Sequence, residues 1–222
     1  MHIGLIGGIG PAATISYYSK LVDEFKKAGL PLKLTITHAD ISVLAHNASN
    51  NQRDAQAKIF AEHLNQLAAA GCDIALITSL TGHFCFKETQ LLSPIELVNG
   101  TAIIDRYCEE KKFGALGILG SPPVLNTQLF GLLNACEIVV PSTGLEDIGN
   151  AYMEMARSGS CSEELRFLFF GAGTAMVKDN NADAVLLAGT DLGLAFDDQD
   201  PGFMVIDALE LHVGELVLLA SK

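Results

Sequence analysis

This sequence has few charged residues, few cations and no long apolar run, and each absence excludes a class of protein. Charged residues make up 18% of the 222 positions and apolar residues 49%, so a buried core is expected and disorder is not. Lysine and arginine number 14 against 26 aspartates and glutamates, for a net charge of −12. Such a surface repels polyanions, which argues against nucleic acid and membranes as partners. No apolar run reaches the roughly 18 residues of a transmembrane helix.

The cysteines and the first residues of the chain indicate a reducing compartment. The five cysteines are odd in number, scattered and without a CxxC pair: Cys72, Cys85, Cys108, Cys136 and Cys161. Reduced thiols explain this pattern better than a disulfide framework or a zinc site does. The opening MHIGLIGGIGP lacks the basic segment of a secretory signal peptide. We therefore expect a cytoplasmic protein without a metal centre.

Short apolar runs alternate with amphipathic stretches along the whole chain. Strands are predicted at 2–6, 33–38, 73–77, 115–119, 137–140 and 183–187. Helices are predicted at 12–28, 51–70, 101–112, 124–134, 145–156, 162–180 and 203–220. Continuous apolar strands separated by helices are typical of a parallel sheet with helices on both faces, so the predicted fold class is α/β.

The chain also resembles itself. GLIGGIGP (4–11) is similar to GILGSPPV (117–124), and GCDIALITSLTGH (71–83) is similar to NADAVLLAGTDLG (181–193), at nearly the same offset. This weak repeat predicts two pseudo-symmetric α/β halves, each a parallel sheet flanked by helices. We assign 1–100 plus 208–222 to the first half and 101–207 to the second. A small-molecule site is expected in the cleft between them.

The glycine-rich turn GGIGPAAT (7–14) has three open interpretations. Gly8, Gly10 and Ala13 fit a loose dinucleotide-binding fingerprint, although no acidic residue closes the second strand directly. The glycines could instead serve tight packing alone, with Pro11 at the first position of a helix. Finally, the backbone N–H groups could form a nest for a carboxylate, to which Thr14 adds a hydroxyl.

Five motifs occur here in the order in which they occur in the aspartate/glutamate racemase family. They are GLIGGIGPAAT (4–14), NNQR (50–53), TSLTGHF (78–84), LGILGSPPV (116–124) and ADAVLLAGTDL (182–192). Because these motifs span almost the whole chain, the resemblance is more specific than any one of them. The chain looks most like the aspartate racemase branch. That resemblance implies two pseudo-symmetric α/β halves and an isomerase that uses no pyridoxal phosphate or other cofactor.

The resemblance also implies a two-thiol mechanism, and this sequence departs from it at both thiols. In the family, one cysteine from each half faces the α-carbon of the substrate, one removing a proton and the other delivering one. Ser79 stands at the first cysteine position and Gly189 at the second, while Asp191 replaces a family glutamate. A serine hydroxyl is far less acidic than a thiol, so Ser79 would need an adjacent base.

His83 is the candidate base for Ser79. It lies four residues further on, and residues i and i+4 share one face of a helix. The alternative is a histidine that caps a helix or is otherwise satisfied by hydrogen bonds. On the second side Gly189 has no side chain, and Thr190 and Asp191 are the nearest polar groups.

The resemblance implies that the residues lining the substrate are better preserved than the thiols. The positions that would bind it are Gly8, Thr14, Arg53, Thr81, Ser121 and Thr190. Arg53 could pair with a side-chain carboxylate of the substrate in a bidentate fork, or it could be a solvated arginine at the start of a helix.

These observations support three functions. The first is a cofactor-independent amino-acid racemase or isomerase scaffold that acts on or binds a small acidic amino acid or dicarboxylate. The second is a catalytically inactive paralogue that binds such a carboxylate ligand. The third is a one-sided lyase or decarboxylase of the same superfamily. Family members often form dimers, so a homodimer is also an expectation.

Overall fold

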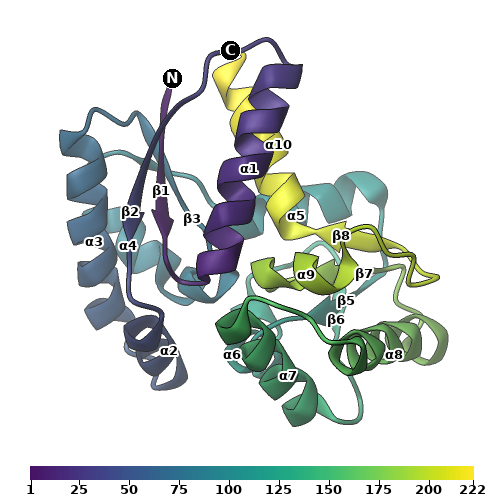
Figure 1. The fold of residues 1–222 in the computed structure, drawn as a ribbon. Helices are drawn as coiled ribbons and strands as arrows, with labels where there is room; N and C mark the ends of the chain where they lie inside the picture. The colour runs from purple at the N-terminus through teal and green to yellow at the C-terminus, as the bar shows by residue number, and fades with distance from the viewer. The chain divides into compact units, whose positions relative to one another are not determined.

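The computed structural model describes residues 1–222, and the chain divides into two compact units (Figure 1). The first unit contains Met1–Gly100 together with Leu209–Lys222, and the second contains Thr101–Ala208. Each unit is built around one four-stranded parallel sheet.

The sheet of the first unit has the strand order β2-β1-β3-β4. Its strands are β1 (His2–Gly7), β2 (Lys33–His38), β3 (Ile74–Ile77) and β4 (Glu96–Leu97). All residues of β1 and β3 are buried, because these two central strands have neighbours on both sides and helices on both faces. Ile6 pairs with Ile77, so β1 and β3 end side by side.

The helical segments of the first unit follow the strands. They are α1 (Pro11–Lys27), α2 (Ile41–Ser49), α3 (Arg53–Ala69), η1 (Leu80–Cys85), α4 (Phe86–Leu92) and α10 (Ala208–Ala220). Figure 1 shows α1 beside α10, and the Tyr17 hydroxyl lies 2.6 Å from His212 Nδ1 across this contact. Thus the last helix of the chain completes the first unit.

The second unit repeats this arrangement with the strand order β6-β5-β7-β8. Its strands are β5 (Ala115–Leu119), β6 (Glu137–Val139), β7 (Ala184–Leu187) and β8 (Val205–Asp207). Its helical segments are α5 (Gly100–Lys111), α6 (Pro122–Asn126), η2 (Leu129–Gly131), α7 (Leu145–Ser158), α8 (Glu163–Asn180), η3 (Thr190–Leu192) and α9 (Gly193–Phe196). The predicted α/β class with two similar halves is therefore confirmed.

Two predicted helices differ from the structure. The stretch 124–134 is not one helix, because Gln128, Leu129 and Phe130 all have positive φ angles that end the short α6 and leave only the turn η2. The stretch 203–220 begins with β8, whose three residues pair with β7 before α10 starts. Strands this short carry too little periodicity to be separated from a following helix.

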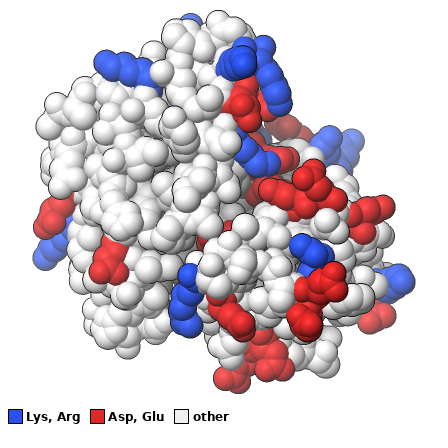
Figure 2. All heavy atoms as spheres, viewed as in Figure 1, with Lys and Arg blue, Asp and Glu red and all other residues white.

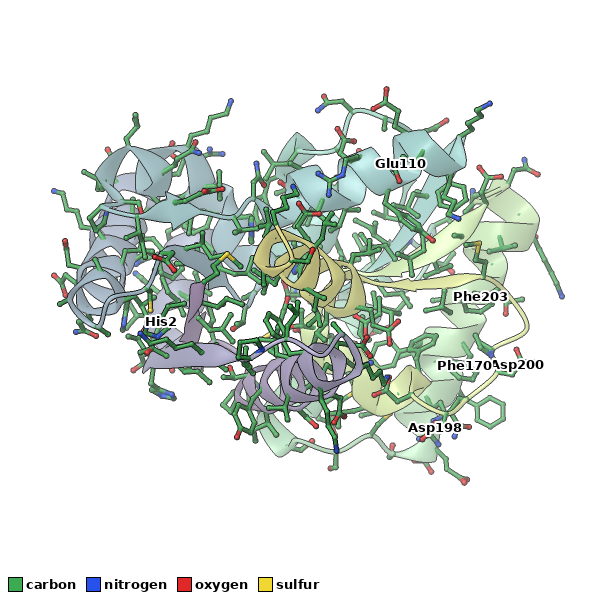
Figure 3. All side chains as sticks on the ribbon, turned by 90° about the horizontal axis from the view of Figure 1, so that it is seen from above. His2, Glu110, Phe170, Asp198, Asp200 and Phe203 are labelled. Carbon is green, nitrogen blue, oxygen red and sulfur yellow. The ribbon has the colours of Figure 1, made fainter.

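An aromatic cluster packs beside the second sheet. The ring of Phe196 packs against the rings of Phe170 and Phe203, with centroid distances of 4.9 and 6.4 Å. Phe170 and Phe203 are labelled near each other in Figure 3. The ring of Phe203 lies so close to Gly173 in α8 that a Cβ there would be only 2.2 Å away. The loop that carries Asp198 and Asp200 (Figure 3) connects Phe196 to Phe203 of this cluster.

The surface agrees with the composition. On the face shown in Figure 2, acidic side chains form larger clusters than basic ones, in keeping with the net charge of −12. None of the helices combines the length and the apolar character needed to cross a membrane.

Candidate functional site

Each sheet has a topological switch point, where the chain leaves two adjacent strands in opposite directions. In the first unit this point lies between β1 and β3, because β2 lies beyond β1 and β4 lies beyond β3. In the second unit it lies between β5 and β7. Open parallel sheets bind ligands outside the carboxyl ends of the strands at such points. Ligand contacts are therefore expected there in each unit.

The turn after β1 is packed so tightly that only glycine fits. Gly8 has φ +86°, and a Cβ on it would lie 2.5 Å from the carbonyl oxygen of Ala39 and from His38 Nδ1. The N–H of Gly8 donates to Thr14 Oγ1 at 2.9 Å, and that hydroxyl donates to the Gly10 carbonyl at 3.1 Å. Helix α1 begins at Pro11, as predicted. The contacts support the tight-packing interpretation, since Gly8 and Thr14 bond to each other.

One further observation bears on the dinucleotide interpretation of this turn. The nearest acidic residue after β2 is Asp40, whose carboxylate accepts a hydrogen bond from the N–H of Ser42 at 2.7 Å and caps α2. The residue that would have to bind a ribose therefore has a structural role.

The end of β3 holds Thr78 and Ser79. Thr78 is fully buried, and its hydroxyl donates to the carbonyl of Ile6 at 2.9 Å, which ties β3 to the end of β1. Ser79 has an extended backbone and precedes η1, but its side chain makes no capping hydrogen bond. The hydroxyl of Ser79 is thus a half-buried polar group at the switch point that does not cap the following helical turn.

His83 lies one turn after Ser79, and both of its ring nitrogens contact backbone groups. Nδ1 lies 3.0 Å from the carbonyl of Ser79, and Nε2 accepts a hydrogen bond from the N–H of Gly100 at 3.1 Å. Because Nε2 accepts, Nδ1 carries the proton and donates it to the Ser79 carbonyl. The ring contacts the backbone of Ser79 and not its hydroxyl, so this arrangement favours the hydrogen-bonded alternative over a base.

A second histidine continues the same hydrogen-bond chain. His212 in α10 donates from Nε2 to the Gly100 carbonyl at 3.1 Å, and Tyr17 donates to its Nδ1 at 2.6 Å. Burial lowers the pKa of His83 to about 4. Burial, with a smaller contribution from His83, lowers the pKa of His212 to about 3. Both imidazoles are therefore neutral at pH 7.

Arg53 begins α3 at the surface. Its Nε donates to the side-chain oxygen of Asn51 at 3.0 Å, and Nη1 lies 3.8 Å from Glu88 Oε1. Exposed fractions of 43% for Arg53 and 30% for Glu88 make this a weak, solvated ion pair. The other oxygen of this carboxylate, Glu88 Oε2, is buried without a hydrogen-bond partner, so Arg53 is the cation that Glu88 would lose if the guanidinium turned to a ligand.

The remaining candidates of the first unit lie in η1. Thr81 is half-buried there, two residues after Ser79. Cys85, at the end of η1, is fully buried, and burial raises the pKa of its thiol to about 11. This thiol is protonated at pH 7 and belongs to the core.

In the second unit, Ser121 and the residues after β7 lie at the switch point. Leu119 pairs with Leu187, and the N–H of Ala188 donates to the Leu119 carbonyl at 2.8 Å, so the two strand ends are adjacent. Ser121 precedes α6 with φ −67° and is 4% exposed. Thr190 and Asp191, at 6% and 3% exposed, follow Gly189 in η3.

Tyr152 of α7 is the residue at this point that sequence reasoning missed. Its hydroxyl donates to Asp191 Oδ2 at 3.1 Å, and a Cβ on Gly189 would lie 2.2 Å from its ring carbon Cε2. A tyrosine in an amphipathic helix resembles an ordinary core residue, so the only usable signal was the missing side chain at Gly189. Burial, followed by the charge of Asp191, raises the pKa of Tyr152 well above its usual value.

Neither half-site offers a ready set of metal ligands. No three or more His, Cys, Asp or Glu side chains in the structure are grouped so that they could hold a metal ion. The chemistry that these residues support as they stand is hydrogen bonding and ion pairing with a polar ligand.

Comparisons with known proteins identify one matching family and several similar structures. The family model described as Asp/Glu/Hydantoin racemase matches residues 6–216. A putative Asp/Glu racemase from Yersinia pestis has a similar structure with a TM-score of 0.80, 19% identity and full coverage of both chains. An aspartate racemase homologue from Pyrococcus horikoshii has a TM-score of 0.78 and 22% identity, covering 100% of this chain and 99% of that one.

A third solved structure is the aspartate racemase of Picrophilus torridus, with a TM-score of 0.78, 18% identity, and coverage of 100% of this chain and 95% of that one. At these identities the likeness shows the fold. No curated protein matches the sequence.

Proposed function

Since the chain belongs to the Asp/Glu/hydantoin racemase family, we propose that it binds a small acidic amino acid or dicarboxylate and does not racemise it with a pair of thiols. The observation that carries this proposal is the state of the two strand ends. At the end of β3, Ser79 has no base on its hydroxyl, because the ring of His83 is hydrogen-bonded to backbone. At the end of β7, Gly189 has no side chain and the ring of Tyr152 lies against it.

The ligand contacts that we propose come from the residues identified above. The residues that would bind the ligand are Arg53, Thr81, Ser121 and Thr190, while Gly8 and Thr14, which are hydrogen-bonded to each other, would shape the turn beside it. Arg53 is the candidate for a carboxylate of the ligand, because its present partner Glu88 is 3.8 Å away and partly solvated. No pyridoxal phosphate or other cofactor is part of this proposal.

A catalytic role is the second candidate, and one observation favours it. The Ser79 hydroxyl makes no capping hydrogen bond, so it is available to a ligand at the switch point. A racemase-type isomerase or a one-sided lyase would use Ser79 together with His83 or Asp191. Such chemistry would require His83 to give up its hydrogen bonds to the backbone.

One experiment separates binding from turnover. The protein, without added cofactor, is incubated in D₂O with L- or D-aspartate or glutamate, and deuterium at the α-carbon is followed by NMR. In parallel, calorimetry measures binding of the same amino acids and of succinate. We expect binding without exchange. Exchange from both enantiomers would contradict the proposal and establish racemisation, while exchange from one alone would establish one-sided chemistry.

Arg53 provides the variant that tests the ligand class. Arg53→Ala should weaken binding about tenfold or more, because a charge-assisted hydrogen bond to a carboxylate is lost. Lys58→Ala is the matched control, since it removes one exposed positive charge from the same helix. Equal effects of the two substitutions would show that Arg53 acts only through its positive charge and makes no direct contact with the ligand.

The proposal also covers the oligomeric state and the cellular location of the protein. We propose a homodimer in the cytoplasm, on the resemblance alone. Sedimentation equilibrium at micromolar concentration tests the dimer, because a monomer mass of 23.6 kDa would contradict it.

A further inference from the structure

The end of β7 differs from an ordinary strand end because a tyrosine from another element fills the place of a side chain. Gly189 has φ −116° and ψ 116°, which any residue can adopt, so its backbone does not require glycine. A Cβ at this position would instead lie 2.2 and 2.6 Å from ring atoms Cε2 and Cζ of Tyr152. The ring of Tyr152 therefore explains why residue 189 has no side chain.

Tyr152 is held in this place from two sides. Its hydroxyl donates to Asp191 Oδ2 at 3.1 Å, two residues after Gly189. One turn earlier in α7, Gly149 packs against Pro122, where a Cβ would be 3.0 Å from the proline ring. Helix α7 is thus packed against the turns that follow both β5 and β7, at the switch point of the second sheet.

The chemistry of this pair is that of a fixed hydrogen-bonding surface. A phenol that donates to a carboxylate in a buried setting stays protonated, as the raised pKa of Tyr152 indicates. Tyr152 keeps 8% of its surface accessible, so part of the residue can be reached. Because the phenol proton is already donated to Asp191, the oxygen of Tyr152 and the carboxylate of Asp191 can only accept, and the group of an acidic amino acid that can donate to them is its ammonium.

We propose that Tyr152, positioned by Asp191, is the side chain with which the second unit meets its ligand at the end of β7, in place of residue 189. This inference rests on the proposed function for the ligand itself. It makes Tyr152 a determinant of specificity, because the phenol occupies the space beside Gly189 and its hydrogen bond orients the carboxylate of Asp191. It also predicts that residue 189 and residue 152 cannot both carry large side chains.

A thermodynamic cycle without ligand tests the packing half of the proposal. Gly189→Ala should lower Tm by about 5 °C, because its Cβ meets the ring of Tyr152. In a Tyr152→Ala background the same substitution should leave Tm unchanged or raise it. Equal losses in both backgrounds would overturn the proposal. If Tyr152→Ala fails to fold, Tyr152→Val serves as the background without a ring.

Ligand affinity tests the functional half. Tyr152→Phe keeps the ring and removes the hydroxyl, so aspartate affinity should fall about tenfold, which is the loss of one hydrogen bond of ordinary net strength. Tm should fall as well, because the buried carboxylate of Asp191 loses the hydrogen bond from the phenol, so affinity is measured well below the Tm of both proteins. Tyr107→Phe, the same change elsewhere in the second unit, is the control and should leave affinity unchanged. Unchanged affinity in Tyr152→Phe would overturn the role of the phenol. Should the wild type bind no acidic ligand, the proposed function fails, and the cycle above still decides whether Tyr152 fills the site.

Discussion

After the third strand of the first unit comes a serine whose hydroxyl caps nothing, and after the third strand of the second unit comes a glycine beneath a tyrosine ring. The two sheets otherwise have the same strand order and the same switch point. In the first unit the nearby polar side chain, His83, is bound to backbone; in the second, Asp191 is bound by a phenol. A repeated fold has therefore kept its framework while its two strand ends acquired different chemistry.

The two units also differ in their histidines, and this difference should affect how their stability depends on pH. All six histidines of the sequence lie in the first unit: His2, His38, His46, His63, His83 and His212. Two of them, His83 and His212, are fully buried and hydrogen-bonded to the N–H and the carbonyl of one residue, Gly100. The second unit has no such titrating pair of imidazoles.

The largest expected effect is acid destabilisation confined to the first unit. The folded-state pKa values of His83 and His212, about 4 and about 3, lie below the ordinary value of 6.5. Below pH 6.5 the unfolded chain therefore binds protons that the folded chain does not, and the free energy of unfolding falls as pH decreases. From pH 8 to pH 5 the two residues together should remove about 4 kcal/mol.

Urea unfolding at pH 8, 6.5 and 5 measures this loss, and hydrogen exchange locates it. His83→Gln should remove about half of the pH dependence, whereas His46→Gln, at a position outside the buried pair, should leave it intact. If amides of the second unit lose protection first on acidification, the contrast between the units is wrong.

A smaller effect is expected from making the first glycine turn resemble the second. Gly8 aligns with Ser121 in the internal repeat, but Gly8 has φ +86° and Ser121 has φ −67°. Gly8→Ser should cost on the order of 3 kcal/mol, because a left-handed backbone and a crowded Cβ act together. Chemical denaturation measures the loss.

The control for this substitution separates crowding from backbone strain. Gly29 also has a positive φ, but nothing lies within 4 Å of the position that a Cβ would take there. Gly29→Ser should therefore cost only the part that comes from the dihedral angle. Equal losses of unfolding free energy at both positions would show that the close approach of Ala39 and His38 to Gly8 adds nothing to the cost of the substitution.

The smallest effect is expected at two serines that precede helical segments, one in each unit. Ser162 accepts a hydrogen bond from the N–H of Leu165 at 3.2 Å and caps α8, whereas Ser79 makes no capping bond. Ser162→Ala should cost about 1 kcal/mol, and Ser79→Ala should cost less than about 0.5 kcal/mol. A loss at Ser79 as large as that at Ser162 would mean that its hydroxyl stabilises the fold and is not available to a ligand.

Much of the fold was predictable from local patterns. The apolar runs at 2–6, 73–77, 115–119 and 183–187 all overlap strands of the structure, because a buried parallel strand needs a continuous apolar segment. The run at 33–38 alternates apolar and polar residues and overlaps the edge strand β2, which has no buried residue. The short strands β4 and β8 and the broken helix at 124–134 were missed. Two or three paired residues leave no periodic signal, and the positive φ angles at Gln128 and Phe130 follow from their surroundings.

The strand ends were predictable in place but not in contacts. The internal repeat and the strand pattern located Ser79 and Gly189, since the carboxyl ends of parallel strands follow directly from that pattern. What surrounds them comes from distant parts of the chain. His83 bonds to Gly100, and Tyr152 lies against Gly189, although neither pair is close in sequence.

Local sequence thus decides where β3 and β7 end and which residue types stand there, because backbone pairing and burial act on each short segment by itself. Only the folded chain decides what those residues can do. Packing brings α7 against the end of β7 and α10 against α1, and in doing so it assigns a ring to the space beside Gly189 and two neutral imidazoles to Gly100. The hydroxyl of Ser79, by contrast, still makes no capping hydrogen bond once these tertiary contacts are in place.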